Sequence, residues 1–286
     1  MPELPEVQTI VSDLKKPLIG LKITGIWTDI SAFRKIEKDV VGRKILGIRR
    51  RGKNILIGLS GGKTLLIHQR MTGHLLYGLW GLKDHEWQSK ISGPLLNDPQ
   101  NRFLHLIFNL SNAKQLALSD LRKFAKVTTW STDKLDKLPD IAKLGPEPLE
   151  PLFDFKKFCE ILADKRGKIK IVLMNQEIIT GIGNIYSDEI LWEAGIHPFK
   201  LVEKLSEEEL KNIFNAIKKV LRRAIEARGD SMSDYRRPSG EKGGYQEIQN
   251  AYQMTGRKCR KKDGGFIKRI KLAGRSAHFC PIHQKL

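Results

Sequence analysis

Met1-Pro2-Glu3-Leu4-Pro5-Glu6 opens the chain, and apolar side chains then recur at helical spacing as far as Leu14. Pro17 and Gly20 interrupt this pattern, so the sequence predicts a helix that starts at Leu4 and stops before residue 20. Proline and acidic residues in a first turn suit the positive end of the helix dipole. The predicted helix is amphipathic, and its apolar face must lie on another layer of the fold.

The same six residues contain groups that could take part in catalysis. A proline at position 2 usually leads to removal of the initiator methionine, which leaves a free secondary α-amine on Pro2. Part of such an amine is unprotonated at neutral pH and can attack a carbonyl carbon to form an iminium. Glu3 supplies a neighbouring carboxyl group for proton transfer. An ordinary helix start is the commoner explanation of the hexapeptide alone, and the two interpretations are compatible because a helix start is a rigid mount for an amine.

Composition sets the broad class. The chain has 286 residues and 40% hydrophobic content, enough for two domains with real cores. It carries 51 Lys+Arg against 32 Asp+Glu, a formal charge of +19, which favours nucleic acid as partner; a basic protein from a basic proteome is the alternative. No long apolar run or signal peptide is present, so we expect a soluble, cytoplasmic monomer that does not contact membranes.

Residues 21–128 contain short runs rich in Val, Ile and Leu, separated by Gly-containing turns, and this spacing predicts a β-sandwich or barrel beneath the helix. The runs are 44–48, 54–59, 64–68, 103–110 and 115–119. We expect residues 77–102 to form a long polar loop, and the sequence says little about its role.

Two turns of this region suggest contacts with nucleic acid. Arg49-Arg50-Arg51-Gly52-Lys53 places four cations around a glycine, so Lys53 could point into a groove while the arginines meet phosphates; a solvated basic hairpin is the alternative. Arg122 and Phe124 lie at a strand end, where a ring beside an arginine could insert into a base stack. A core phenylalanine next to a surface arginine is the commoner explanation.

The second half of the chain returns to helical periodicity. Leu144-Gly145-Pro146-Glu147-Pro148 is typical of a linker, and residues 152–228 contain four helical segments. Thr180-Gly181-Ile182-Gly183-Asn184 precedes one of them, where glycines and a helix N-terminus could approach a phosphate. Residues 229–246 are polar and glycine-rich, consistent with a mobile lid or with an ordinary linker.

The last segment, from Cys259 to His283, predicts a β-hairpin. Cys280-Pro281-Ile282-His283 has the spacing of metal ligands, and Cys259 could add a third ligand across the turn. Lys262 occupies the position of a Cys-x-x-Cys partner. Asp263 is the nearest candidate for a fourth ligand, and zinc is therefore an uncertain cofactor.

Taken together, these fragments resemble the bacterial formamidopyrimidine-DNA glycosylases, bifunctional enzymes of base excision repair. The resemblance covers essentially the whole chain and rests on fragments that occur in the family's order. They are Pro2 to Val7, Arg50 to Lys53, His68 with Met71-Thr72-Gly73, Asp120 to Phe124, Leu144 to Leu149, Gly181 to Tyr186, and Gly274-Arg275-Ser276 to Phe279-Cys280-Pro281.

The resemblance implies an α+β, multidomain fold: an N-terminal helix on a β-sandwich, a helix-two-turn-helix domain and a C-terminal zinc-finger-like hairpin. It also implies an activity, namely excision of 8-oxoguanine and formamidopyrimidines from damaged duplex DNA followed by strand cleavage through β,δ-elimination. Our predicted boundaries are 1–130 for the catalytic domain, 131–151 for the linker, 152–246 for the helical domain with its lesion-recognition loop, and 247–286 for the hairpin.

Residue roles follow from the resemblance position by position. Pro2 would attack C1′ and Glu3 would shuttle protons, while Lys53 and Arg275 would serve β- and δ-elimination. Met71, Arg122 and Phe124 would fill the space left by the flipped nucleotide. His68, Lys165 and Asn184 would hold backbone phosphates, and Ser231 to Tyr245 would cover the flipped lesion.

The sequence departs from the family pattern in the finger, which normally carries four cysteines. Here the candidate ligands are Cys259, Cys280 and His283, so we expect either a three-ligand site completed by Asp263 or water, or a finger held by packing alone. Lys123 and Leu121 also replace an arginine and a proline of the family, at little expected cost. Two other functions stay open: an endonuclease VIII-like glycosylase for oxidised pyrimidines, and a non-catalytic damaged-DNA-binding protein.

Overall fold

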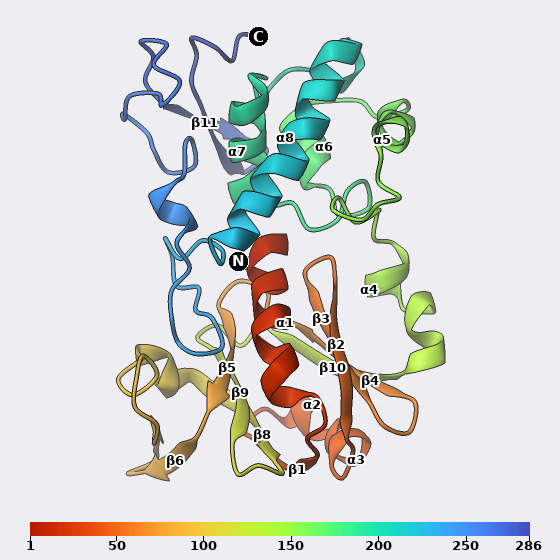
Figure 1. Ribbon diagram of the computed structural model, residues 1–286, viewed down its shortest axis with the longest axis vertical. Helices are drawn as coiled ribbons and strands as arrows, with labels where there is room; N and C mark the ends of the chain where they lie inside the picture. The colour runs from red at the N-terminus through yellow and green to blue at the C-terminus, as the bar shows by residue number, and fades with distance from the viewer. The chain divides into compact units, whose positions relative to one another are not determined.

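A computed structural model describes all residues from 1 to 286, and they form two compact units (Figure 1). The N-terminal unit consists of residues 1–142 and 227–244. The C-terminal unit consists of residues 143–226 and 245–286. The predicted domain boundaries remain predictions, but in this division the segment 227–244 groups with the N-terminal unit, whereas the sequence analysis placed it in the helical domain.

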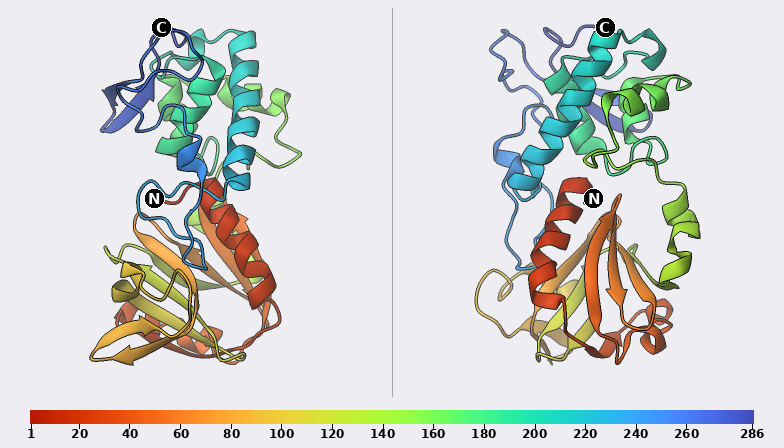
Figure 2. Two further views of the ribbon diagram at one scale, coloured as in Figure 1. Left: turned by 60° about the vertical axis from the view of Figure 1, so that its left-hand side comes forward. Right: turned by 45° about the vertical axis from the view of Figure 1, so that its right-hand side comes forward.

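The N-terminal unit is a sandwich of two antiparallel four-stranded sheets, with strand orders β1-β8-β9-β5 and β10-β4-β3-β2 (Figure 2). Its strands are β1 (Ile23–Thr28), β2 (Ile45–Arg51), β3 (Asn54–Leu59), β4 (Lys63–His68), β5 (Gly73–Gly78), β8 (Leu104–Leu110), β9 (Gln115–Asp120) and β10 (Lys126–Ser131). Its helices are α1 (Leu4–Leu18), α2 (Ser31–Arg34), α3 (Glu37–Val40), η1 (Pro99–Phe103), η2 (Thr132–Lys137) and α4 (Pro139–Ala142).

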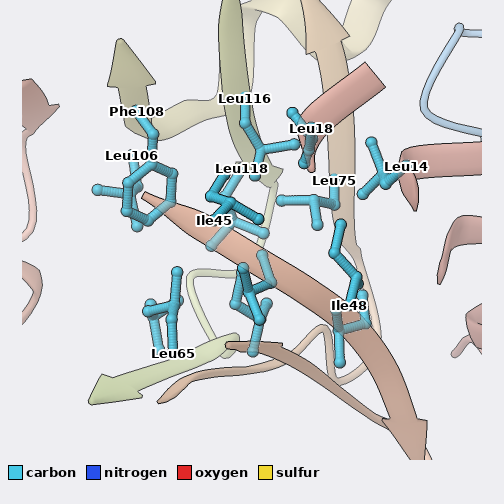
Figure 3. Packing of buried hydrophobic residues seen from close by; sticks show 14 of the residues in the cluster. Leu14, Leu18, Ile45, Ile48, Leu65, Leu75, Leu106, Phe108, Leu116 and Leu118 are labelled. Carbon is cyan, nitrogen blue, oxygen red and sulfur yellow. The ribbon is translucent and has the colours of Figure 1, made fainter. Parts of the chain in front are cut away.

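Helix α1 covers the open side between the two sheets. Val7, Ile10, Leu14 and Leu18 are fully buried and join one core with residues of both sheets (Figure 3). Burying each such side chain contributes about 1.5–3 kcal/mol, so this face fixes the helix and with it the residues that precede Leu4. The predicted helix extends to Leu18 and includes Pro17, which forgoes one i→i−4 hydrogen bond, and it ends before Gly20 as expected.

Residues 77–102 add a small hairpin and a second core to the sandwich. The hairpin consists of β6 (Trp80–Lys83) and β7 (Glu86–Ser89). Trp80 and Leu95 are buried with side chains of β8 and β9, and the Trp87 ring meets the Trp27 ring edge-on at 4.9 Å. The expectation of a loop is therefore wrong for much of this range, because the apolar residues among the polar ones pack into a core.

The C-terminal unit is helical and ends in a hairpin. Its helices are α5 (Phe155–Leu162), α6 (Ile169–Met174), α7 (Asn184–Ala194), η3 (Val202–Lys204), α8 (Glu207–Glu226) and η4 (Tyr245–Glu247). Strands β11 (Lys268–Leu272) and β12 (Arg275–Phe279) pair antiparallel. The predicted α+β fold, with a helix on a sandwich, a helical region and a C-terminal hairpin, is confirmed. None of the helices combines the length and the apolar character that crossing a bilayer requires.

Candidate active site and metal cluster

Pro2 and Glu3 are buried immediately before α1. Glu3 is the N-cap residue: its side chain accepts the backbone N–H of Glu6, and its own N–H donates to Glu6 Oε2 at 2.8 Å. This reciprocal capping box satisfies two of the N–H groups that a helix start leaves without intrahelical partners. The helix-start interpretation of the hexapeptide is therefore confirmed, and the catalytic interpretation stays compatible with it.

The basic turn between β2 and β3 is tied to α1. Arg50 Nε donates to Gln8 Oε1 at 3.1 Å, and Arg50 Nη1 donates to the carbonyl of Gly52 at 3.0 Å. Gly52 has φ +58°, a conformation that favours glycine. Lys53 is only 6% exposed. This burial distinguishes it from the lysine of a solvated basic hairpin.

His68, at the end of β4, is held as a neutral donor. Burial, together with the nearby cations Arg70 and Lys53, lowers the pKa of His68 to about 4. Its Nδ1 accepts the N–H of Arg70 at 3.0 Å, which leaves the proton on Nε2. A neutral imidazole of this tautomer can donate a hydrogen bond to a phosphate oxygen without adding charge.

Met71, Arg122 and Phe124 lie together on two neighbouring turns. The Arg122 guanidinium lies 4.5 Å from the centre of the Phe124 ring, and its Nη1 lies 3.2 Å from Met71 Sδ. Met71 is 48% exposed and Phe124 is 53% exposed. Phe124 is therefore not a core residue, which was the commoner explanation on sequence grounds. An exposed apolar pair joined by an arginine suits insertion between bases.

Asp120 organises these turns, and the sequence analysis assigned it no role of its own. This buried carboxylate accepts the Thr72 hydroxyl at 2.5 Å and the backbone N–H groups of Arg122 and Ala125 at 3.3 and 2.7 Å. Its position as the last residue of β9 was the only local signal. Asp120 thus fixes both turns that carry the exposed cluster.

In the C-terminal unit, Asn184 is the first residue of α7, where the glycine turn meets the helix. Gln176 braces this turn, accepting the N–H of Gly181 and donating to the carbonyl of Ile182. Asn184 lines a groove of about 320 Å³ together with Tyr252, Gln253, Thr255, Arg269, Ser276 and His278.

Lys165, in the turn after α5, does not line this groove. Arg275 is exposed at the tip of the β11–β12 hairpin.

A buried polar network that the sequence analysis missed supports this hairpin. Asp188 Oδ1 pairs with Lys170 Nζ at 2.5 Å, and both side chains are fully buried. Asp188 Oδ2 accepts the backbone N–H of His278 at 3.1 Å and lies 2.8 Å from its Nδ1. The only local signal was a lysine within the apolar run of α6. The network connects α6, α7 and β12, and so fixes the strand that starts with Arg275.

Cys259, Asp263, Cys280 and His283 form a cluster whose ligand atoms all lie within 4.8 Å of one another. Asp263 Oδ2 lies 3.2 Å from Cys280 Sγ and 2.5 Å from His283 Nδ1. His283 Nε2 lies 3.3 Å from the carbonyl of Trp192, an outer contact that turns Nδ1 toward the cluster.

The turn that presents Asp263 allows this close approach. Although burial opposes its ionisation, hydrogen bonds from the Gly265 N–H and from His283 hold the pKa of Asp263 below its usual range. A Cβ on Gly265 would lie 2.4 Å from Cys280 Sγ, so only glycine fits there. Two sulfurs, one imidazole nitrogen and one carboxylate oxygen are ligands that zinc accepts in four-coordinate sites, so the residues present fit this metal.

Comparison with known proteins identifies the family. Residues 1–127 match the formamidopyrimidine-DNA glycosylase N-terminal domain, and residues 144–236 match the formamidopyrimidine-DNA glycosylase H2TH domain. The chain belongs to the formamidopyrimidine-DNA glycosylase family. Family members from Pelotomaculum thermopropionicum and Desulforamulus reducens are 39% and 38% identical, the first over 100% of both chains and the second over 100% of this chain and 99% of its own.

Solved structures of formamidopyrimidine-DNA glycosylases share the fold. A point mutant of the Lactococcus lactis protein in complex with Fapy-dG-containing DNA has a TM-score of 0.87 and 35% identity, with 100% of both chains covered. The wild-type L. lactis protein in complex with DNA containing an oxidised pyrimidine has a TM-score of 0.86 and 34% identity, again over 100% of both chains. The resemblance stated from the sequence is therefore confirmed.

Proposed function

We propose that this protein is a DNA glycosylase and AP lyase that removes oxidised purines from duplex DNA through a Schiff base on Pro2. Family membership supports DNA glycosylase activity in base excision repair. The L. lactis relatives were captured with Fapy-dG-containing and abasic-site-containing DNA. The observation that carries the proposal is the start of α1, where the capping box fixes Glu3, the residue that follows Pro2.

The chemistry begins at the amine of Pro2. After removal of Met1, the Pro2 nitrogen bonds to C1′ of the damaged nucleotide as the glycosidic bond breaks, and the base leaves with the bonding electrons and a proton. Loss of the amine proton and opening of the sugar ring give the iminium. Glu3 is the group placed to move these protons.

Strand cleavage follows from the iminium. Removal of a C2′ proton lets the 3′-phosphate leave, with Lys53 as the buried cation that assists this β-elimination. Arg275, exposed at the hairpin tip, serves the second elimination at the 5′-phosphate. His68, Lys165 and Asn184 hold backbone phosphates, and Met71, Arg122 and Phe124 fill the space left by the extruded nucleotide.

We also propose that the protein binds a zinc ion through Cys259, Asp263, Cys280 and His283. When bound, the metal would cross-link the two turns at the base of the hairpin that carries Arg275. It takes no part in bond making or breaking. The structure favours a four-ligand set with Asp263 over a finger held by packing alone, because the carboxylate lies within reach of both His283 and Cys280.

Borohydride trapping tests the reaction. Pro2→Gly should reduce covalent capture on a duplex with 8-oxoguanine opposite cytosine by orders of magnitude, because a primary amine at a more flexible residue loses position. Duplex affinity should change little, since phosphate contacts do not involve this nitrogen. Mass spectrometry should locate the wild-type cross-link on Pro2. A loss of affinity that equals the loss of rate would contradict the assignment.

A second candidate substrate class is oxidised pyrimidines, because the wild-type L. lactis relative was crystallised with DNA that contains one. Excision rates for 8-oxoguanine and for an oxidised pyrimidine, each in the same duplex, decide between the two. A purely DNA-binding role is disfavoured by the retained Pro2, Glu3 and Lys53, since binding alone requires no terminal amine. Trapping with a confirmed free Pro2 would exclude that role.

A further inference from the structure

The proposed function leaves residues 77–102 without a task, although they are ordered and lie within the N-terminal unit. Segment 227–244 belongs to the same unit and runs beside β5 (Figure 1). It contains most of the stretch proposed to cover the lesion, Ser231 to Tyr245, and we call residues 227–244 the covering segment. The two segments meet at three places, and each contact orders the backbone of segment 227–244.

The first contact is a buried ion pair. Arg236 Nε lies 3.3 Å from Asp98 Oδ2, and the two side chains are 17% and 4% exposed. Arg236 Nη1 also donates to the carbonyls of Asp234 and Tyr235, at 3.2 and 3.1 Å. Asp98 is itself fixed, because its Oδ1 accepts the N–H of Gln100 at the start of η1. One guanidinium thus links the 77–102 segment to two successive peptide groups of the covering segment.

The other two contacts follow the chain beyond Arg236. The N–H of Tyr77 donates to the carbonyl of Pro238 at 2.8 Å. Gly240 has φ +86°, and a Cβ there would lie 2.8 Å from Leu95 Cδ2. Leu95 is 1% exposed and packs with Trp80 in the second core. The covering segment therefore rests on a rigid apolar anchor as well as on a charge pair.

We propose that residues 77–102, acting through Asp98, hold segment 227–244 in the shape that recognises the lesion. Asp98 is then a positioning residue that determines which base is excised. Moving the segment away would leave a carboxylate and a guanidinium buried without their partners, which is costly. This inference rests on the proposed function and adds to it a task for a segment that carries no reacting group.

Two reactions distinguish the positioning role of Asp98 from the nucleophilic role of Pro2. Excision of 8-oxoguanine requires the covering segment to enclose a base, whereas incision at a preformed abasic site offers no base to enclose. In the full chain, Asp98→Asn should slow single-turnover excision by about ten- to a hundredfold, the usual cost of displaced recognition groups. Abasic-site incision in the same duplex should stay within about twofold. Hydrogen exchange should increase in residues 229–244.

Asp39→Asn is the matched control. Asp39 also lies in the N-terminal unit, pairs with Lys63 at 3.0 Å and accepts the Thr129 hydroxyl at 2.6 Å. Its loss should leave the ratio of the two rates unchanged. Gly240→Ala provides a second route, because it should push the covering segment off Leu95 without leaving a buried charge, and it should produce the same split as Asp98→Asn.

Equal losses in both reactions, or an unchanged excision rate with faster exchange in residues 229–244, would overturn the inference. Wild-type protein that neither incises abasic DNA nor traps with borohydride would instead overturn the proposed function. The two failures are distinct, because the first appears only in the variants and the second appears already in the wild type.

Discussion

Glu6 shows how one buried side chain serves two distant parts of the chain. Its Oε2 accepts the N–H of Glu3, and its Oε1 accepts the N–H of Asp230, both at 2.8 Å. Gly229 has φ +83°, and a Cβ there would lie 2.9 Å from Glu6 Oε1. Glycine at 229 is therefore required both by the backbone conformation and by the carboxylate beside it. Glu6 connects the proposed catalytic terminus to the covering segment.

His68 makes stability depend on pH. The folded protein keeps this imidazole neutral down to about pH 4, whereas an unfolded histidine takes up a proton near pH 6.5. Between these values the unfolded state binds the extra proton, so the contribution of His68 to the free energy of unfolding decreases as pH falls. His68→Gln should weaken this pH dependence within that window.

Urea unfolding of wild type and His68→Gln at a series of pH values from about 7 down to about 4.5 measures the effect. Other histidines have lowered pKa values through burial, among them His74 and His197. The difference between the two proteins isolates His68, because these residues are common to both. Identical slopes would show that His68 titrates normally in the folded state.

At the scale of elements, the C-terminal hairpin is short and has only a small buried face. Its strands have five residues each, and Lys268, Arg269 and Lys271 of β11 are all exposed or partly exposed. A two-stranded hairpin is marginal in water without further support. The buried residues Leu272, Ala277 and Phe279 and the Asp188 network anchor it, and the proposed metal would add to this support.

Zinc content and hydrogen exchange test this support. Purified wild type should contain one zinc per chain, and Asp263→Ala should lower the zinc content because one of the four ligands is lost. Chelation should increase exchange in residues 255–286 while α1 and the sandwich keep their protection. Asp136→Ala, an exposed acidic residue of η2 outside the cluster, is the control and should leave the zinc content unchanged. A zinc-free wild type with a protected hairpin would show that packing alone holds it.

The sequence could predict the helices and strands whose apolar residues follow a local pattern. The apolar spacing of α1 and the short runs rich in Val, Ile and Leu indicate a helix on a sandwich, and the short fragments identify the family. Segment 227–244 could not be assigned in the same way, because its partners Glu6, Asp13 and Asp98 lie far away in sequence. Lys170, Asp188 and His278 escaped notice for the same reason, since a polar residue reveals its partner only after folding.

At the scale of the whole molecule, the N-terminal unit is discontinuous. Tyr235 is 4% exposed and belongs to the same core as Val7 and Leu75. Tyr235→Ala should therefore destabilise the N-terminal unit by about 3–5 kcal/mol, as expected for removal of a large buried aromatic side chain. Hydrogen exchange should increase in α1 and the sheets, whereas the amides of α7 and α8 should keep their protection.

Tyr235→Phe is the control for this experiment. It keeps the ring and removes only the hydroxyl, whose donation to the Glu6 carbonyl is long at 3.4 Å. Its effect on the free energy of unfolding should be about 1 kcal/mol or less. If Tyr235→Ala loosens the helices of the C-terminal unit and spares the sheets, the assignment of segment 227–244 to the N-terminal unit is wrong.

The bond between Asp230 and Glu6 joins residues 224 positions apart. At about 5–20 residues per second, a ribosome needs roughly 10–45 s to synthesise that interval. Once β10 has been synthesised, the nascent chain has the residues of α1 and both sheets but still lacks Asp230 and Tyr235. A chain truncated within the helical region would contain Pro2 but would lack segment 227–244, to which we assign lesion recognition. The N-terminal unit can therefore be completed only after residues 227–244 have been synthesised.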